Sequence, residues 1–401
     1  QFRQNLRYTN VANDLTGVRS EGLQSDNQTL NRSENYVVSS SRNFALDNQV
    51  QADFLTGPFA HKMLFGVDYL KTKSDSDYRF AMISPINIFN PVYGSAIPSA
   101  SSLSPFIKVA SDQEQVGTYM QDQIKFDRFT VSLTGRHDWA DATTVSTGSY
   151  PAAGTYPQRD QANTGRVGLN YLFDFGLAPY ISYTTSFQPI TGTDRLGNAF
   201  KPTTGDGSEV GLKYNPTGTT LLLTAALFEI NQKNVLTADP ANVFFSVQTG
   251  AARVRGFEFE ARGNVTRELQ IVGGYSHFDP RVTAANDGTV GKYLTNTAKD
   301  QASLWAKYTW FSGPIAGLGL GAGVRYVGET YGDAANTLRI PSYTLFDAAI
   351  SYDFAYLRPE MKGWTAQINA KNITDRYYVA SCVTSTAYCG LGSARTVLGT
   401  L

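Results

Sequence analysis

The segment Trp364-Thr365-Ala366-Gln367-Ile368-Asn369-Ala370-Lys371 decides the fold of this chain. Its apolar and polar side chains alternate strictly, which is the pattern of a β-strand with different surroundings on its two faces. The same alternation recurs over residues 129–139, 209–214, 257–262 and 346–354. We therefore predict an all-β protein whose strands each have one apolar and one polar face.

The composition agrees with one large sheet. Lys plus Arg and Asp plus Glu each number 34, so the zero net charge gives no reason to expect a nucleic-acid partner. With 36 Gly, 23 Tyr, 23 Phe and only 17% charged residues, the chain does not have the composition of a disordered protein. The sequence shows no linker or composition shift, so we expect residues 1–401 to form one domain.

The hydropathy pattern bears on how the chain could enter a membrane. No segment reaches the roughly 18 consecutive apolar residues of a spanning helix, and the most apolar run covers residues 219–228. Insertion would therefore require a transmembrane antiparallel β-barrel. Aromatic residues gather near the expected strand ends, including Tyr171 with Phe173 and Tyr308 with Trp310. They match the aromatic girdles of such barrels, although ordinary β-propensity is the alternative explanation.

The links between these segments alternate in length, as the two rims of an outer-membrane barrel require. Short turns are expected at residues 56–58, 126–128, 174–176, 215–218, 265–267 and 312–314. Long links are expected at residues 11–37, 74–111, 142–163, 189–206, 236–243, 279–297 and 328–341. The segments between them number roughly sixteen, and general porins share an even count near this value, so strand number leaves a passive porin-like channel open.

A set of segments resembles, in order and spacing, the barrel of TonB-dependent outer-membrane siderophore receptors. The set comprises residues 2–8, 64–69, 87–93, 119–123, 135–141, 183–189, 209–214, 256–260, 302–308 and the terminal run Asn372-Ile373-Thr374-Asp375-Arg376-Tyr377-Tyr378. The cysteines that follow Tyr378-Val379-Ala380-Ser381 narrow the resemblance to the ferric-hydroxamate branch, whose cargo is of the ferrichrome and ferrioxamine type.

The resemblance implies a receptor in the outer membrane of a Gram-negative bacterium. Such a receptor binds a ferric hydroxamate siderophore at its extracellular loops and imports it with energy from the TonB complex. The family has an N-terminal plug and a barrel of about 22 strands. We thus expect this chain to hold about 16 of those strands and to lack the plug, the TonB-contacting segment and the first strands. A receptor for another cargo is the alternative.

The resemblance also implies which partners and cofactors to expect. The partners would be the ferric hydroxamate siderophore, outer-membrane lipid and, through segments outside this chain, the TonB complex, but no nucleic acid. Iron would enter already saturated by three hydroxamates. We therefore expect no cofactor and no metal ligands of the protein's own, and a surface of aromatic and hydrogen-bonding groups instead.

The ligand contacts are expected in the long links, where an exposed aromatic residue has no folding role. By resemblance, Phe80 stands where the family has an aromatic residue that lines the siderophore pocket. Tyr78 lies on the same side if that stretch is extended. Tyr388 is a third candidate inside the cysteine loop, although Val383 stands where the family has an aromatic residue. Simple loop packing is the alternative for each.

The cysteines and histidines indicate neither a metal site nor an active site. An even number of cysteines in an exported protein favours a disulfide, here between Cys382 and Cys389. His61, His137 and His277 lack metal-ligand spacing, and we expect them to be ordinary strand or turn residues. No catalytic constellation is visible, since Asp138 directly after His137 must point to the opposite face of its strand. We do not expect an enzyme.

Overall fold

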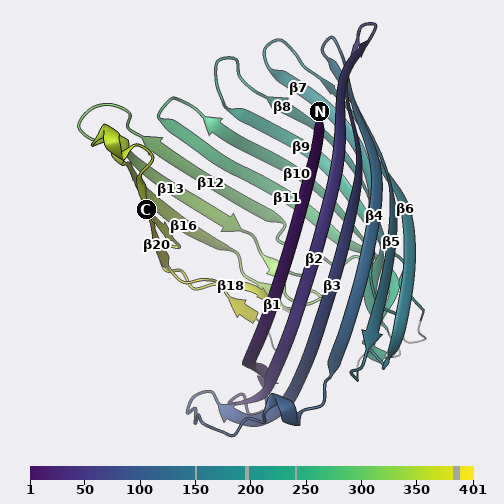
Figure 1. Ribbon diagram of the computed structural model, residues 1–401. Helices are drawn as coiled ribbons and strands as arrows, with labels where there is room; N and C mark the ends of the chain where they lie inside the picture. Colours follow the sequence, from purple (N-terminus) through teal and green to yellow (C-terminus); the bar gives the residue numbers. More distant parts are fainter. Residues whose placement is uncertain (150, 195–197, 240–241, 383–388) are drawn as a thin grey trace.

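The computed structural model describes residues 1–149, 151–194, 198–239, 242–382 and 389–401. Its main element is one antiparallel sheet of 16 strands that curves into an open trough (Figure 1). Neighbouring strands pair in chain order, and β1 and β20 form the two edges within the described residues. The predicted all-β architecture with about sixteen strands is confirmed, but this sheet is not closed into a barrel.

The main-sheet strands are longest near the start of the chain and shortest near its end, although β10 is again long at 23 residues. They are β1 (Phe2–Leu23), β2 (Thr29–Thr56), β3 (Phe59–Asn87), β4 (Ile107–Phe126), β5 (Phe129–Ser146), β6 (Gly154–Tyr171), β7 (Leu177–Gln188), β8 (Thr203–Tyr214), β9 (Leu222–Asp239), β10 (Asn242–Asn264), β11 (Leu269–Ala284), β12 (Asp300–Thr309), β13 (Leu318–Val327), β16 (Tyr343–Asp353), β17 (Thr365–Lys371) and β20 (Thr396–Thr400). Two small hairpins stand outside this sheet, β14 (Thr330–Tyr331) with β15 (Arg339–Ile340) and β18 (Val379–Cys382) with β19 (Cys389–Leu391).

Helical structure in the described residues is limited to single 3-10 turns. These are η1 (Ala100–Ser102), η2 (Phe354–Tyr356) and η3 (Pro359–Met361). Within the described part of the chain, no helix has the length and apolar character needed to cross a membrane.

One rim of the sheet carries short turns, and we call it the short-turn rim. Its two tightest links are residues 57–58 and 127–128, whose first residues have a positive φ, 60° at Gly57 and 51° at Asp127. Primed hairpin turns require this backbone conformation. Aromatic rings contact one another along this rim. The pairs are Phe59–Phe126, Phe129–Tyr171, Tyr171–Phe173, Tyr308–Trp310 and Tyr352–Phe354.

The opposite rim, which we call the long-loop rim, differs from the prediction. The sequence predicts a link over residues 11–37, but β1 and β2 leave only residues 24–28 between them. Likewise, the predicted link 74–111 shrinks to residues 88–106, and the predicted link 236–243 shrinks to residues 240–241. The Ser, Thr and Asn residues suggested loops because they are polar on both faces of the strand. Polar side chains do not prevent main-chain pairing where both faces meet water.

The two faces of the sheet follow from the register. On β3, Phe65 and Val67 are 50% and 38% exposed on the apolar face, and the next residue, Asp68, lies on the polar face. In a transmembrane barrel the polar face lines the lumen and the apolar face meets lipid. His137 and Asp138 lie on opposite faces, as predicted, with Asn163 and Arg136 as their respective partners.

Candidate functional site

Three aromatic rings meet on the polar face near the long-loop rim, and we call them the aromatic wall. Tyr78 and Phe80 of β3 stack with ring centroids 6.0 Å apart and planes 17° apart. Phe106, directly before β4, meets both rings edge-on, with its centroid 5.3 Å from that of Phe80 and 6.1 Å from that of Tyr78. Phe80 keeps 42% of its surface exposed. The wall thus leaves an apolar surface exposed on the polar face of the sheet.

The wall corrects one prediction and extends another. The sequence places Tyr78 and Phe80 in a long link, but both lie within β3, because that strand continues to Asn87. The expectation that their side chains share one side is confirmed, since the strand is extended there. Phe106 was not predicted from the sequence as part of this site. Its signal is an aromatic residue directly before an alternating segment, a weak one in a chain with 23 Phe.

A chain of hydrogen bonds fixes the phenol of Tyr78. Its hydroxyl donates to Asn35 Oδ1 at 2.6 Å, and Asn35 Nδ2 donates to Ser33 Oγ at 2.8 Å. Ser33 Oγ in turn donates to the Glu21 carboxylate. Ser33 and Asn35 are only 1% and 2% exposed, so this chain lies behind the wall and not on its surface. Such a buried and connected network holds the Tyr78 ring in one orientation.

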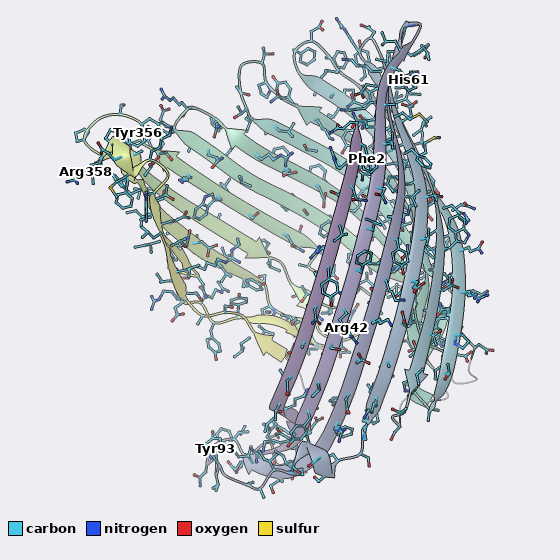
Figure 2. All side chains as sticks on the ribbon, viewed as in Figure 1. Phe2, Arg42, His61, Tyr93, Tyr356 and Arg358 are labelled. Carbon is cyan, nitrogen blue, oxygen red and sulfur yellow. A yellow bond between two sulfur atoms is a disulfide. The ribbon has the colours of Figure 1, made fainter. Side chains whose placement is uncertain are left out.

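The link 88–106 is braced against the strands that carry the wall. Arg79 donates to Asp77 at 2.7 Å and to the carbonyl oxygens of Ala100 and Leu103, each at 3.1 Å. The tip of the link remains open, with Tyr93 78% exposed. In Figure 2, Tyr93 lies at one end of the molecule and His61 at the other, which marks the two rims.

Farther along the same rim, the segments 285–299, 328–342, β18 and β19 interlock, and we call them the clamped platform. The Asn296 amide donates to the Cys382 carbonyl oxygen at 2.7 Å and accepts from the Cys382 N–H at 2.9 Å. Asn336 holds the main chain of Tyr293 in the same way, at 3.1 and 2.7 Å. Each amide therefore replaces a strand partner across loops that are distant in sequence.

A small core lies in and next to the platform. Leu345 and Ala298 are each 1% exposed, and Cys382 is 1% exposed. A Cβ atom at Gly332 would lie 2.7 Å from the Cys382 Cβ, so these segments are in close contact. Cys382 and Cys389 form the expected disulfide bond. The third predicted contact, Tyr388, lies outside the described residues, so it cannot be placed with Tyr78 and Phe80.

A charged network occupies the polar face closer to the short-turn rim. Arg136 donates to Asp68 at 2.9 Å and to Asp138 at 2.7 Å, and Tyr119 donates to Asp47 at 2.7 Å. Two carboxylates thus pair with one guanidinium, and Asp47, which lies opposite Asp68 in register, adds a third carboxylate to this part of the polar face. Its sequence signal is the spacing of Arg136 and Asp138, two residues apart on the polar face of one strand.

The histidines have ordinary partners. His61 lies 2.8 Å from Asp122, His137 lies 2.7 Å from Asn163, and His277 lies 2.8 Å from Asp300. Among the described residues, no group of three or more His, Cys, Asp or Glu side chains could hold a metal ion.

Comparison with known proteins gives the context of this geometry. Residues 1–373 match the family model described as TonB dependent receptor-like, beta-barrel. The chain is 37% identical to the ferrichrome outer membrane transporter/phage receptor of Escherichia coli K12 over 99% of its length, which is 55% of that protein. It is also 36% identical to the ferrioxamine receptor of Yersinia enterocolitica, covering all of this chain and 56% of that one. The chain thus spans little more than half of these relatives.

Solved structures agree on the fold. The siderophore receptor PiuA from Acinetobacter baumannii superimposes with a TM-score of 0.83 at 22% identity, covering 99% of this chain and 61% of that one. The ferric-catecholate import receptor Fiu from Escherichia coli K12 gives a TM-score of 0.81, also at 22% identity, with the same two coverages. At this identity the likeness shows the fold alone.

Proposed function

The chain belongs to the TonB-dependent receptor β-barrel family, and from this premise we propose that it serves in the import of a ferric hydroxamate siderophore of the ferrichrome or ferrioxamine type. Proteins of this family are receptors and transporters of the Gram-negative outer membrane and not enzymes. The long-loop rim then faces the outside of the cell, as the longer loops of outer-membrane barrels do.

One observation carries the choice of cargo. The relatives that match nearly the whole chain at 34–37% identity are named for ferrichrome and ferrioxamine. The aromatic wall supports this choice, because a siderophore whose iron is already saturated needs contact surface and hydrogen bonds instead of metal ligands. The iron would remain bound to its siderophore throughout, and the protein would need no cofactor of its own.

Import by the full receptor is part of the proposal, because the chain spans about 55% of these relatives. Tyr78 and Phe80 would contact the siderophore at the long-loop rim, and Tyr388 would add a contact from the cysteine loop. The plug and the remaining strands of the full receptor would complete the lumen. The TonB complex would act through those segments to release the cargo inward, and lipid would surround the apolar face.

Tryptophan fluorescence of the full-length receptor, with its plug, tests the proposal. We expect saturable quenching by ferrichrome or ferrioxamine B and none by ferric enterobactin, a catecholate complex. Quenching by ferric enterobactin alone would move the receptor to another cargo class. If none of the three complexes quenched the fluorescence, the hydroxamate proposal would be wrong, and a receptor for another cargo or a passive channel would be the remaining explanations.

A pair of substitutions on one strand tests the wall itself. Phe80→Ala should weaken siderophore binding by at least tenfold, since a buried aromatic contact is worth more than about 1.4 kcal/mol. Phe65→Ala is the matched control, because Phe65 is similarly exposed on the apolar face of the same strand. Equal affinities of the two variants would argue against the wall as the binding surface.

A further inference from the structure

We propose that Asp160 and Gln158 on β6 form a subsite for a positively charged amine arm of the cargo. The receptor would then prefer a ferric hydroxamate that carries a free primary ammonium over the same complex without that charge. This inference rests on the proposed function and makes its substrate class narrower.

Both side chains lie on the polar face. Asp160 pairs in register with Ala140 and Gln158 with Ala142, and these β5 residues continue the same face as Arg136 and Asp138. Asp160 is separated from the short-turn rim by most of β6 and lies only six residues after the first residue of that strand, Gly154. The pair therefore lies toward the long-loop rim, on the outer side of the charged network, where an arriving ligand would pass.

The subsite contains an acceptor that lacks a donor. Gln158 is only 8% exposed, and its Nε2 donates to Asp160 Oδ2 at 2.6 Å and to the Phe200 carbonyl oxygen at 2.9 Å. These two acceptors fix the orientation of the amide, because the reversed amide would place Oε1 against both of them. In this orientation Gln158 Oε1 is buried without a hydrogen-bond partner. A buried polar atom without a partner costs about 1–3 kcal/mol.

The Asp160 carboxylate, which accepts a hydrogen bond from Gln158, has no cationic partner among the described residues. Asp68 and Asp138 pair with Arg136, and Asp347 pairs with Arg325. By contrast, no Lys, Arg or His of the described residues lies within 4.0 Å of the Asp160 carboxylate, whose hydrogen-bond partner is the neutral Gln158 amide. Burial raises the cost of an unpaired carboxylate, so this position favours a ligand that brings a positive charge.

A primary ammonium fits these two needs together. It has three N–H donors and no acceptor, so one N–H can serve the Asp160 carboxylate directly. Another can serve the Gln158 carbonyl oxygen after a small shift of the Gln158 side chain that opens this buried atom to the ligand. The bond to Asp160 is charge-assisted and stronger than a bond between neutral groups. A ligand with a carboxylate or catecholate at this point would meet like charge instead.

The test compares two forms of one ligand in the full-length receptor. Ferrioxamine B has a free ammonium arm, and its N-acetyl derivative has the same iron centre without that charge. We expect the wild-type receptor to bind ferrioxamine B about tenfold more tightly than the acetylated form, the difference that one charge-assisted hydrogen bond gives. Equal binding of the two forms would overturn the inference and leave the proposed function intact. Failure to bind either form, or ferrichrome, would overturn both.

Substitutions of Asp160 test whether this residue is responsible for the preference for a ligand with an ammonium arm. Asp160→Asn should weaken binding of ferrioxamine B to the level of the acetylated form and leave the acetylated form unchanged, whereas Asp160→Glu should retain a preference. Asp141→Asn is the control, because Asp141 is an exposed carboxylate of β5 that pairs with Arg159. A preference that survives in Asp160→Asn would contradict the assignment. If this variant fails to fold, the comparison of the two ligands in the wild-type receptor still decides the inference.

Discussion

The aromatic wall and the clamped platform lie on the same rim but use their residues in opposite ways. The wall leaves Phe80 42% exposed, and its hydrogen bonds lie behind the rings. In the platform, Cys382 is almost fully buried, as is Leu345 of the adjoining β16, and asparagine side chains satisfy the main chain of neighbouring loops. One region therefore keeps its apolar surface exposed, whereas the other buries its side chains against neighbouring loops.

Truncation of a buried side chain next to the platform should therefore destabilise the protein more than truncation of a side chain in the aromatic wall. Leu345→Ala removes a side chain that is 1% exposed and should cost about 2–5 kcal/mol of stability, because it leaves a cavity. Phe80→Ala removes a larger side chain but should change stability by less, since much of that side chain is already in water. Thermal unfolding of the full-length receptor and hydrogen exchange of the β16 amides measure both. Equal losses would remove the distinction between the two regions.

We expect the second-largest effect from loss of the Asn296 clamp, which is the pair of hydrogen bonds between the Asn296 amide and the main chain of Cys382. Asn296→Ala deletes both hydrogen bonds to Cys382 and leaves its carbonyl oxygen and N–H without these partners, at a cost of about 1–3 kcal/mol. We expect faster hydrogen exchange at the Cys382 amide and in β18, with little change at β3. Asn163→Ala, at an exposed residue, serves as the control. Unchanged exchange at Cys382 would show that the disulfide and packing alone hold the hairpin.

A smaller effect is expected from the hydroxyl of the wall. Tyr78→Phe keeps the ring but leaves Asn35 Oδ1 without its donor in a buried site. The cost should be about 1 kcal/mol, which corresponds to a roughly fivefold loss of siderophore affinity if the ring loosens. Fluorescence quenching measures this affinity. Affinity equal to that of the wild type would indicate that packing, and not the hydrogen-bond chain, orients the ring.

The smallest effect concerns acidification of the platform. The Thr337 hydroxyl and the N–H groups of Leu338 and Thr337 donate to Asp333 and hold its pKa below the ordinary value. A lowered pKa in the folded state contributes stability above the unfolded value near pH 4, and this contribution is lost as the pH falls through the folded pKa. The protection of the Leu338 amide, measured relative to its intrinsic exchange rate at each pH, should therefore decrease below about pH 4 in the wild type and depend less on pH in Asp333→Asn.

Sequence patterns account for the sheet better than for the site. Alternation around Ile368 or Phe257 predicts a strand because the two faces meet different surroundings, and the strand count followed from it. The length of β1 to β4 did not follow, since Ser and Thr side chains are compatible with both strand and loop. The Asn296 clamp could not be predicted either, because its partner Cys382 is 86 residues away in sequence. Phe106 joins Tyr78 and Phe80 only through the register of β3 and β4.

The unequal length of the strands has a consequence for how the molecule meets its surroundings. β3 has 29 residues and β17 has seven. At roughly 3.3 Å per residue β3 is about 95 Å long, whereas about 11 residues suffice to cross a bilayer at a tilt. In the proposed orientation, with the long-loop rim outside the cell, this side of the sheet would extend beyond the membrane and carry Phe80 in its outer part. In that orientation a solute arriving from outside would meet the long strands β1 to β4 first, so the height of these strands would set the target area for the first encounter.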